Sequence, residues 1–125
     1  MDSNELYAGL LLRKALNWNQ PDVPGRLLEA MEAGADPDSL IHLNPGAATA
    51  LSQAIRNHDP EAVAVLLAHG ADPDLPIRPY GRNPTAMEHA RGCASDGRRF
   101  GWEWAERAFE VERLMVAALD RGIKG

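Results

Sequence analysis

The sequence has one cysteine, no long apolar run, no excess of basic residues and no glycine-rich phosphate loop. Cys93 cannot form a disulfide within the chain, which indicates a reducing compartment. The apolar run at residues 8–12 has charged residues on both sides and is too short for a signal peptide or a membrane span. We therefore expect a cytoplasmic protein that does not insert into a membrane.

Net charge and chain length restrict the class of protein and the number of domains. The 18 acidic residues outnumber the 13 basic ones, and the net charge of -5 favours solubility and argues against a general nucleic-acid binder. At 125 residues the chain is long enough for one hydrophobic core and too short for two. We expect a single domain over residues 1–125.

Part of the chain repeats itself with a period of 36 residues. Shifting the sequence by 36 positions aligns residues 24–54 with residues 60–90, and ten of the 31 aligned positions are identical. A period of this size is typical of stacked supersecondary units, each of which needs its neighbours to bury its apolar face. Three units are about the fewest expected to be stable, and the chain has room for three.

The five residues from Gly34 to Asp38 are duplicated without change from Gly70 to Asp74. The glycine can take the left-handed conformation that ends a helix, the aspartates can accept backbone N–H groups, and the proline prevents the helix from resuming. Each copy therefore predicts a helix end followed by a tight turn. We interpret the four aspartates of these turns as turn-stabilising groups and not as paired catalytic carboxylates: Asp36, Asp38, Asp72 and Asp74.

The stretch 49–74 resembles an ankyrin repeat. Thr49, Leu51 and Ala54 stand at the spacing of that family's opening Thr-Pro-Leu-His-x-Ala motif. The closing end of the repeat's second helix is matched by Val63, Leu66, Leu67, Gly70, Ala71 and Asp72. The resemblance implies an all-α ankyrin-repeat solenoid of about three helix-loop-helix units, at approximately residues 5–48, 49–84 and 85–122. From each turn glycine to the next threonine there are 15 residues, so both finger loops are expected to be enlarged.

Local signals place the helices. Asp2 and Glu5 have the spacing of a capping box for a first helix that reaches about Asn17. Pro24 and Pro60 suit the first turn of two outer helices, which are expected to reach Gly34 and His69. Inner helices are expected to start at Thr49 and at Thr85, and Asp59 is the expected N-cap of the second outer helix.

Residues 91–104 depart from the repeat, because a standard unit needs only about five residues at this place. The segment Ser95-Asp96-Gly97 and Gly101 have turn chemistry, which predicts either an inserted loop or an inner helix followed by a loop. An apolar helical stripe then runs from Trp104 to Leu119 and is expected to end at Gly122. Glu103 and Arg107 would pair four residues apart on the outer face of this last helix.

Signals for catalysis and for cofactors are poor. His42, His58, His69 and His89 show no metal-ligand spacing and have no cysteine partner, so no metal site is expected. Arg91, Arg98 and Arg99 stand near Cys93 and would lower its pKa, yet no general base is placed to use the thiol. We expect no enzymatic activity and no cofactor, with a thiol-dependent enzyme at Cys93 as the remote alternative.

The ankyrin resemblance implies a concave binding face made of finger tips and of the exposed side of the inner helices. The matching finger positions are His42, Asn44, Arg78, Tyr80, Arg82 and Asn83, and those on the inner helices are Gln53, Arg56, Asn57 and His89. Residues 75–101 also carry five arginines against two acidic residues. Together with Arg98, Arg99, Phe100 and Trp102, this segment would form a basic, aromatic patch that receives an acidic segment or a phosphate. The alternative is that Phe100 and Trp102 only cover the end of the last repeat.

These features predict a module that binds another protein and is a monomer when free. Short ankyrin proteins without a further domain resemble inhibitors or immunity proteins of toxic enzymes, so the partner is expected to be a toxin or effector enzyme. The alternative is an adaptor or assembly chaperone that does not inhibit its partner. The sequence leaves open whether the fingers or residues 91–104 make the main contact.

Overall fold

The computed structural model describes residues 3–16, 20–38, 40–42, 47–74 and 85–124, and over these residues the fold is all-α. Two three-residue strands, β1 (Leu40–His42) and β2 (Ala47–Thr49), form an antiparallel hairpin between the second and third helices. In the described ranges, no helix is both long and apolar enough to cross a bilayer. The helices are α1 (Ser3–Ala15), α2 (Val23–Glu32), α3 (Ala50–Arg56), α4 (Pro60–Ala68), α5 (Ala86–Phe100) and α6 (Ala105–Lys124).

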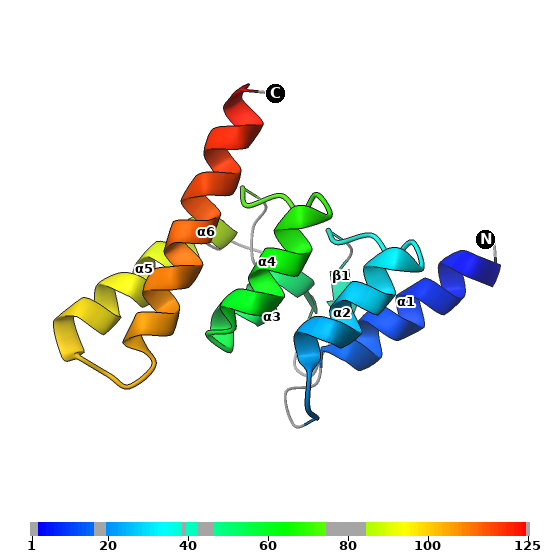
Figure 1. Ribbon diagram of the computed structural model, residues 1–125, viewed down its shortest axis with the longest axis horizontal. Helices are drawn as coiled ribbons and strands as arrows, with labels where there is room; N and C mark the ends of the chain where they lie inside the picture. The colour runs from blue at the N-terminus through cyan, green and yellow to red at the C-terminus, as the bar shows by residue number, and fades with distance from the viewer. Residues whose placement is uncertain (1–2, 17–19, 39, 43–46, 75–84, 125) are drawn as a thin grey trace.

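The helices are arranged as three consecutive pairs that lie side by side (Figure 1). Within each pair the helices contact one another: α1 with α2, α3 with α4, and α5 with α6. Contacts between pairs join α2 to α4, α4 to α6, and α3 to α5. The second helices of the pairs therefore form one row, α2–α4–α6, and α3 and α5 lie next to each other in the other row.

Several helix starts are fixed by N-capping side chains, of which the sequence predicts the one at Asp59. Thr49 caps α3 and Asp59 caps α4, each by accepting a hydrogen bond from the backbone N–H three residues later. Thr85 and Glu88 form a reciprocal capping box at the start of α5. The capping box predicted at Asp2 lies outside the described residues.

The two duplicated turns have the predicted geometry. Gly34 and Gly70 are left-handed, with φ of 102° and 93°, as a helix-ending glycine requires. The first aspartate of each turn accepts the backbone N–H two residues later, at 2.9 Å in both turns. The turns are also joined to each other, because the Asp38 carboxylate accepts the backbone N–H of Asp72 at 2.8 Å. The prediction that these aspartates stabilise turns is confirmed for Asp36, Asp38 and Asp72.

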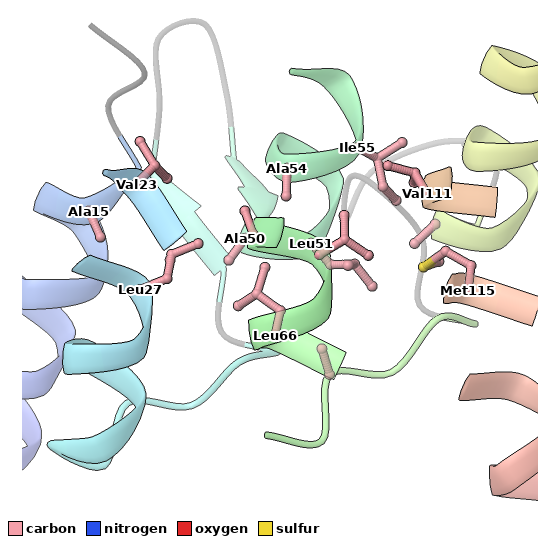
Figure 2. Packing of buried hydrophobic residues seen from close by; sticks show 14 of the residues in the cluster. Ala15, Val23, Leu27, Ala50, Leu51, Ala54, Ile55, Leu66, Val111 and Met115 are labelled. Atoms are coloured by element: carbon pink, nitrogen blue, oxygen red, sulfur yellow. The ribbon is translucent and has the colours of Figure 1, made fainter. Parts of the chain in front are cut away.

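The core runs across all three helix pairs. Figure 2 shows the buried side chains in a row that leads from Ala15 and Leu27 through Leu66 to Met115. Burying apolar side chains of this size contributes about 1.5–3 kcal/mol each. The two helices α3 and α5, which contact each other, each bury two alanines: Ala50 and Ala54 in α3, and Ala86 and Ala90 in α5.

Two expectations for the C-terminal part are wrong. The segment Ser95-Asp96-Gly97 is not a turn but lies inside α5, and only Gly101, with φ of 63°, ends that helix. A Cβ atom at position 97 would lie 2.9 Å from the Ala105 Cβ, so Gly97 permits the close approach of α5 and α6. Gly122 does not end the last helix, which continues to Lys124. Unlike the two turn glycines, it is not followed by a proline, and one glycine costs a helix only about 1 kcal/mol.

Candidate functional site

The inner-helix positions predicted to bind a partner lie at the C-terminal end of α3 and the start of α5. Arg56 is exposed, and Gln53 and His89 are half-buried. Asn57 is exposed, but its side-chain amide donates to the Gln53 carbonyl at 2.8 Å and so helps to end α3. Asn57 therefore has a structural role that the sequence did not indicate.

The charge of Arg56 acts on His89, although the two residues belong to different helices. Burial is the main reason why the pKa of His89 lies below its ordinary value, and the nearby His58 and Arg56 lower it further. Because α3 contacts α5, Arg56 and His89 lie on adjacent helices and belong to one polar surface. We call Gln53, Arg56 and His89 the inner-helix face.

Most of the predicted finger positions cannot be added to this face. His42 is the last residue of β1 and is opposite Ala47, the first residue of β2. The remaining finger residues lie outside the described part of the chain: Asn44, Arg78, Tyr80, Arg82 and Asn83.

Four aromatic rings are stacked along the turns that join the paired helices. Phe100 stacks on Trp102 with ring centroids 4.7 Å apart, and Trp102 lies against Trp104 at the same distance with a tilt of 46°. Trp104 stacks on His58 of the α3–α4 turn at 4.2 Å, with an angle of only 3° between the ring planes. We call these four residues the aromatic ladder. It connects the α5–α6 turn to the preceding turn.

The backbone places these rings through two left-handed residues. Gly101 takes φ of 63° after the end of α5, and His58 takes φ of 51° after the end of α3. Positive φ is uncommon for a residue with a side chain, so the His58 conformation needs support from its surroundings. Arg107 of α6 gives this support, because its Nε donates to the His58 carbonyl at 2.8 Å.

Arg107 forms an ion pair with a different residue from the one that the sequence predicts. The sequence suggested a pair with Glu103, but Glu103 precedes the first turn of α6 and Arg107 forms an ion pair with Glu61 of α4 at 3.5 Å. Both side chains of this pair are more than half exposed, so the ion pair itself contributes little. The hydrogen bond to the His58 carbonyl is the stronger link between α6 and the α3–α4 turn.

His58 is the most constrained ring of the aromatic ladder. In the described part of the chain its Nδ1 is buried and has no hydrogen-bond partner. Burial, and to a smaller extent the positive charge of Arg107, lower the pKa of His58 below its ordinary value. The imidazole is therefore held in its neutral form at neutral pH, with one face against Trp104.

No protein-family model, no characterised protein and no solved structure matches this chain.

The arginines at the end of α5 do not act as a free basic patch. Arg98 forms an ion pair with Glu112 at 2.7 Å and lies 5.3 Å from the centroid of the Phe109 ring. Its positive charge is therefore compensated within the chain. Arg99 lies 5.2 Å above the Phe100 ring, an arrangement that permits a cation–π interaction. Phe100 and Trp102 remain 53% and 44% exposed, so the rest of the described chain covers them only in part.

Cys93 lacks the environment of a reactive thiol. It is half-buried, and burial followed by the charge of Asp96 raises its pKa. The expectation that nearby arginines would lower this pKa is wrong, because on a helix the side chains of neighbouring residues point in different directions. Within the described ranges, no group of three or more His, Cys, Asp or Glu side chains is placed to hold a metal ion.

Sequence reasoning missed His58 and Trp104 as members of one surface. In the sequence, His58 is one of four histidines without metal-ligand spacing, and Trp104 is part of an apolar stripe. The alternating pattern of Phe100, Trp102 and Trp104 was a usable signal, since a turn can bring residues two apart onto one side. Nothing in the sequence pairs this pattern with His58, which lies in another repeat.

Proposed function

We propose that the chain is a small ankyrin-repeat solenoid of about three units with enlarged finger loops. Three features support this proposal: the three stacked helix pairs, the identical turns joined by Asp38 and Asp72, and the hairpin that follows the first turn. The contact between α3 and α5, which belong to successive helix pairs, is also what a stack of repeated units requires.

The proposed function is binding of another protein through the inner-helix face and the fingers. The observation that carries it is the contact between α3 and α5, which places Arg56 and His89 on adjacent helices. Arg56 is exposed, and its charge contributes to the lowered pKa of His89. An exposed arginine on a rigid helical stack is well suited to pair with a carboxylate of a partner.

Affinity capture of partners from an extract of the native host tests this proposal. The immobilised protein is compared with an inner-helix variant, Arg56→Glu with His89→Ala, and with a finger variant, Arg78→Ala with Tyr80→Ala and Arg82→Ala. Arg113→Glu on α6 is the matched control, because Arg113 is exposed and lies on the other row of helices.

We expect one partner to be retained by the natural protein and by the control, and lost by at least one of the two variants at unchanged melting temperature. Retention of the same partner by both variants would show that neither the inner-helix face nor the fingers bind it.

An assay of the captured partner separates the two binding roles. An inhibitor or immunity protein would suppress the partner's enzymatic activity in proportion to the complex formed. An adaptor or assembly chaperone would leave that activity unchanged. A thiol-dependent activity finds no support in the raised pKa of Cys93, and Cys93→Ser should leave partner binding intact.

A further inference from the structure

Phe100 and Trp102 form an exposed apolar surface at the end of the aromatic ladder. They are two of the large apolar side chains that the described part of the chain leaves exposed, and their rings stack on one another. The other exposed ones lie on separate helices: Tyr7 and Leu10 on α1, Leu28 on α2, and Val116 on α6. An aromatic pair at a turn is a more compact contact surface than these scattered side chains.

Charges of opposite sign flank this aromatic pair in the sequence. Arg99 precedes it and Glu103 follows it, and both are exposed. Arg98 is already paired with Glu112, whereas the interaction described for Arg99 is with the Phe100 ring. A partner of this surface must therefore present an acidic group, an apolar group and a basic group in that order.

We propose that this partner is a second copy of the chain, docked about a two-fold axis next to Trp102. In an isologous contact, residue i of one copy meets residue j of the other, and residue j meets residue i. Phe100 of each copy then faces Trp102 of the other, and Arg99 of each copy faces Glu103 of the other. The turn is complementary to itself because its positive and negative sides exchange places across the axis.

The contact is small, and this determines its strength. Two half-exposed aromatic side chains and one charged pair per copy bury less than the roughly 1,200 Å² of a typical stable interface. The dimer is therefore weak, with a dissociation constant in the micromolar to millimolar range, and it replaces the expectation of a strict monomer with a concentration-dependent equilibrium. The inner-helix face takes no part in it, so dimer formation does not depend on the function proposed above.

Sedimentation equilibrium over a wide concentration range tests the proposal. The weight-average mass of the natural protein should rise with concentration from that of one chain toward that of two, and the Trp102→Ala variant should stay monomeric. Arg99→Glu places two acidic residues opposite each other at both contacts, and Glu103→Arg places two arginines there. Each of these variants should be monomeric alone.

An equimolar mixture of the two charge variants provides the decisive result. In the mixed dimer, the glutamate introduced at position 99 of one variant would face the arginine introduced at position 103 of the other. At the second contact the unchanged Glu103 would face the unchanged Arg99, so both contacts become attractive. The mixture should regain dimer formation at least as well as the natural protein. Arg13→Glu and Glu29→Arg, reversals of exposed residues on α1 and α2, are the controls and should self-associate like the natural protein, alone and mixed.

The proposal is overturned if the natural protein stays monomeric at every concentration, or if the mixture stays monomeric. Circular dichroism of each variant shows whether it is folded, and any variant that unfolds is replaced by the milder Arg99→Gln or Glu103→Gln. Each of these single substitutions should weaken the dimer and leave the helical signal unchanged.

Discussion

The carboxylate of Asp38 accepts the backbone N–H of Asp72, so the first aspartate of the second turn is held by the last aspartate of the first turn. Asp38 and Asp74 occupy the same place in identical sequences, but the chain has no third copy of the turn for Asp74 to reach. Asp38 therefore accepts a hydrogen bond from the neighbouring repeat, whereas Asp74 has no following turn to bond to.

This difference predicts unequal effects of two matching substitutions. Asp38→Ala removes the inter-repeat hydrogen bond and should lower the free energy of unfolding by about 0.5–1.5 kcal/mol. Asp74→Ala is the control and should change the stability by less than about 0.5 kcal/mol. Urea unfolding followed by circular dichroism measures both. Equal losses would mean that the hydrogen bond does not stabilise the stack.

Gly97 and Gly92 lie on the same helix and should respond to alanine in opposite ways. A Cβ atom at position 97 would meet the Ala105 Cβ at 2.9 Å and its Cα at 3.1 Å, so Gly97→Ala must push α5 away from α6. We expect a loss of about 1–3 kcal/mol. A Cβ at position 92 meets nothing within 4 Å, and Gly92→Ala should gain about 0.5–1 kcal/mol. Thermal unfolding compares the two, and a stabilising Gly97→Ala would contradict the close helix packing.

Stability should fall as the pH falls below neutrality. His58 and His89 both have a pKa lowered from the ordinary 6.5, so the unfolded chain binds protons more readily than the folded one. Protonating either ring is less favourable in the folded chain than in the unfolded chain, so stability falls as the pH falls from the unfolded pKa through the lower folded pKa. The melting temperature measured between about pH 8 and pH 5.5 should show this decrease.

The variant His58→Asn measures how much His58 contributes to the change of melting temperature with pH. His58→Asn keeps a residue type that tolerates the left-handed conformation and removes the titrating ring. It should be less stable than the natural protein at pH 8, because the stack on Trp104 is lost, and should lose less stability on acidification. An unchanged slope in His58→Asn would assign the pH dependence to other groups.

Arg107 should matter more for its hydrogen bond than for its ion pair. Arg107→Met removes both the bond to the His58 carbonyl and the pair with Glu61, and should cost about 1–2 kcal/mol. Glu61→Gln removes only the exposed pair and should cost less than about 0.5 kcal/mol. Chemical unfolding of the two variants gives the comparison. Similar losses would assign the effect to the ion pair.

Features that depend on a few neighbouring residues were predictable from the sequence. The helix start at Thr49, the N-cap at Asp59 and the left-handed Gly34 and Gly70 follow from local chemistry, and all four are confirmed. The capping side chain acts within three residues along the chain and the glycines act through their own backbone, so a single sequence contains all the necessary information.

Features that depend on distant residues were not predictable. Gly97 has the local appearance of a turn glycine, and only its contact with Ala105 of another helix explains why it is helical. The aromatic ladder was missed for the same reason, since the position of Trp104 is explained by His58 in another repeat. The predicted finger residues of the second repeat lie outside the described residues, so that part of the binding hypothesis stays a prediction.

The position of the tryptophans makes intrinsic fluorescence a local probe of the C-terminal helix pair. Two of its three tryptophans, Trp102 and Trp104, belong to the aromatic ladder, and the titrating ring of His58 is in direct contact with one of them. Intrinsic emission is therefore weighted toward the C-terminal helix pair, whereas the far-ultraviolet signal averages over every helix. In a stack of units, a difference between the two melting curves would reveal that the last pair separates before the rest, without any attached label.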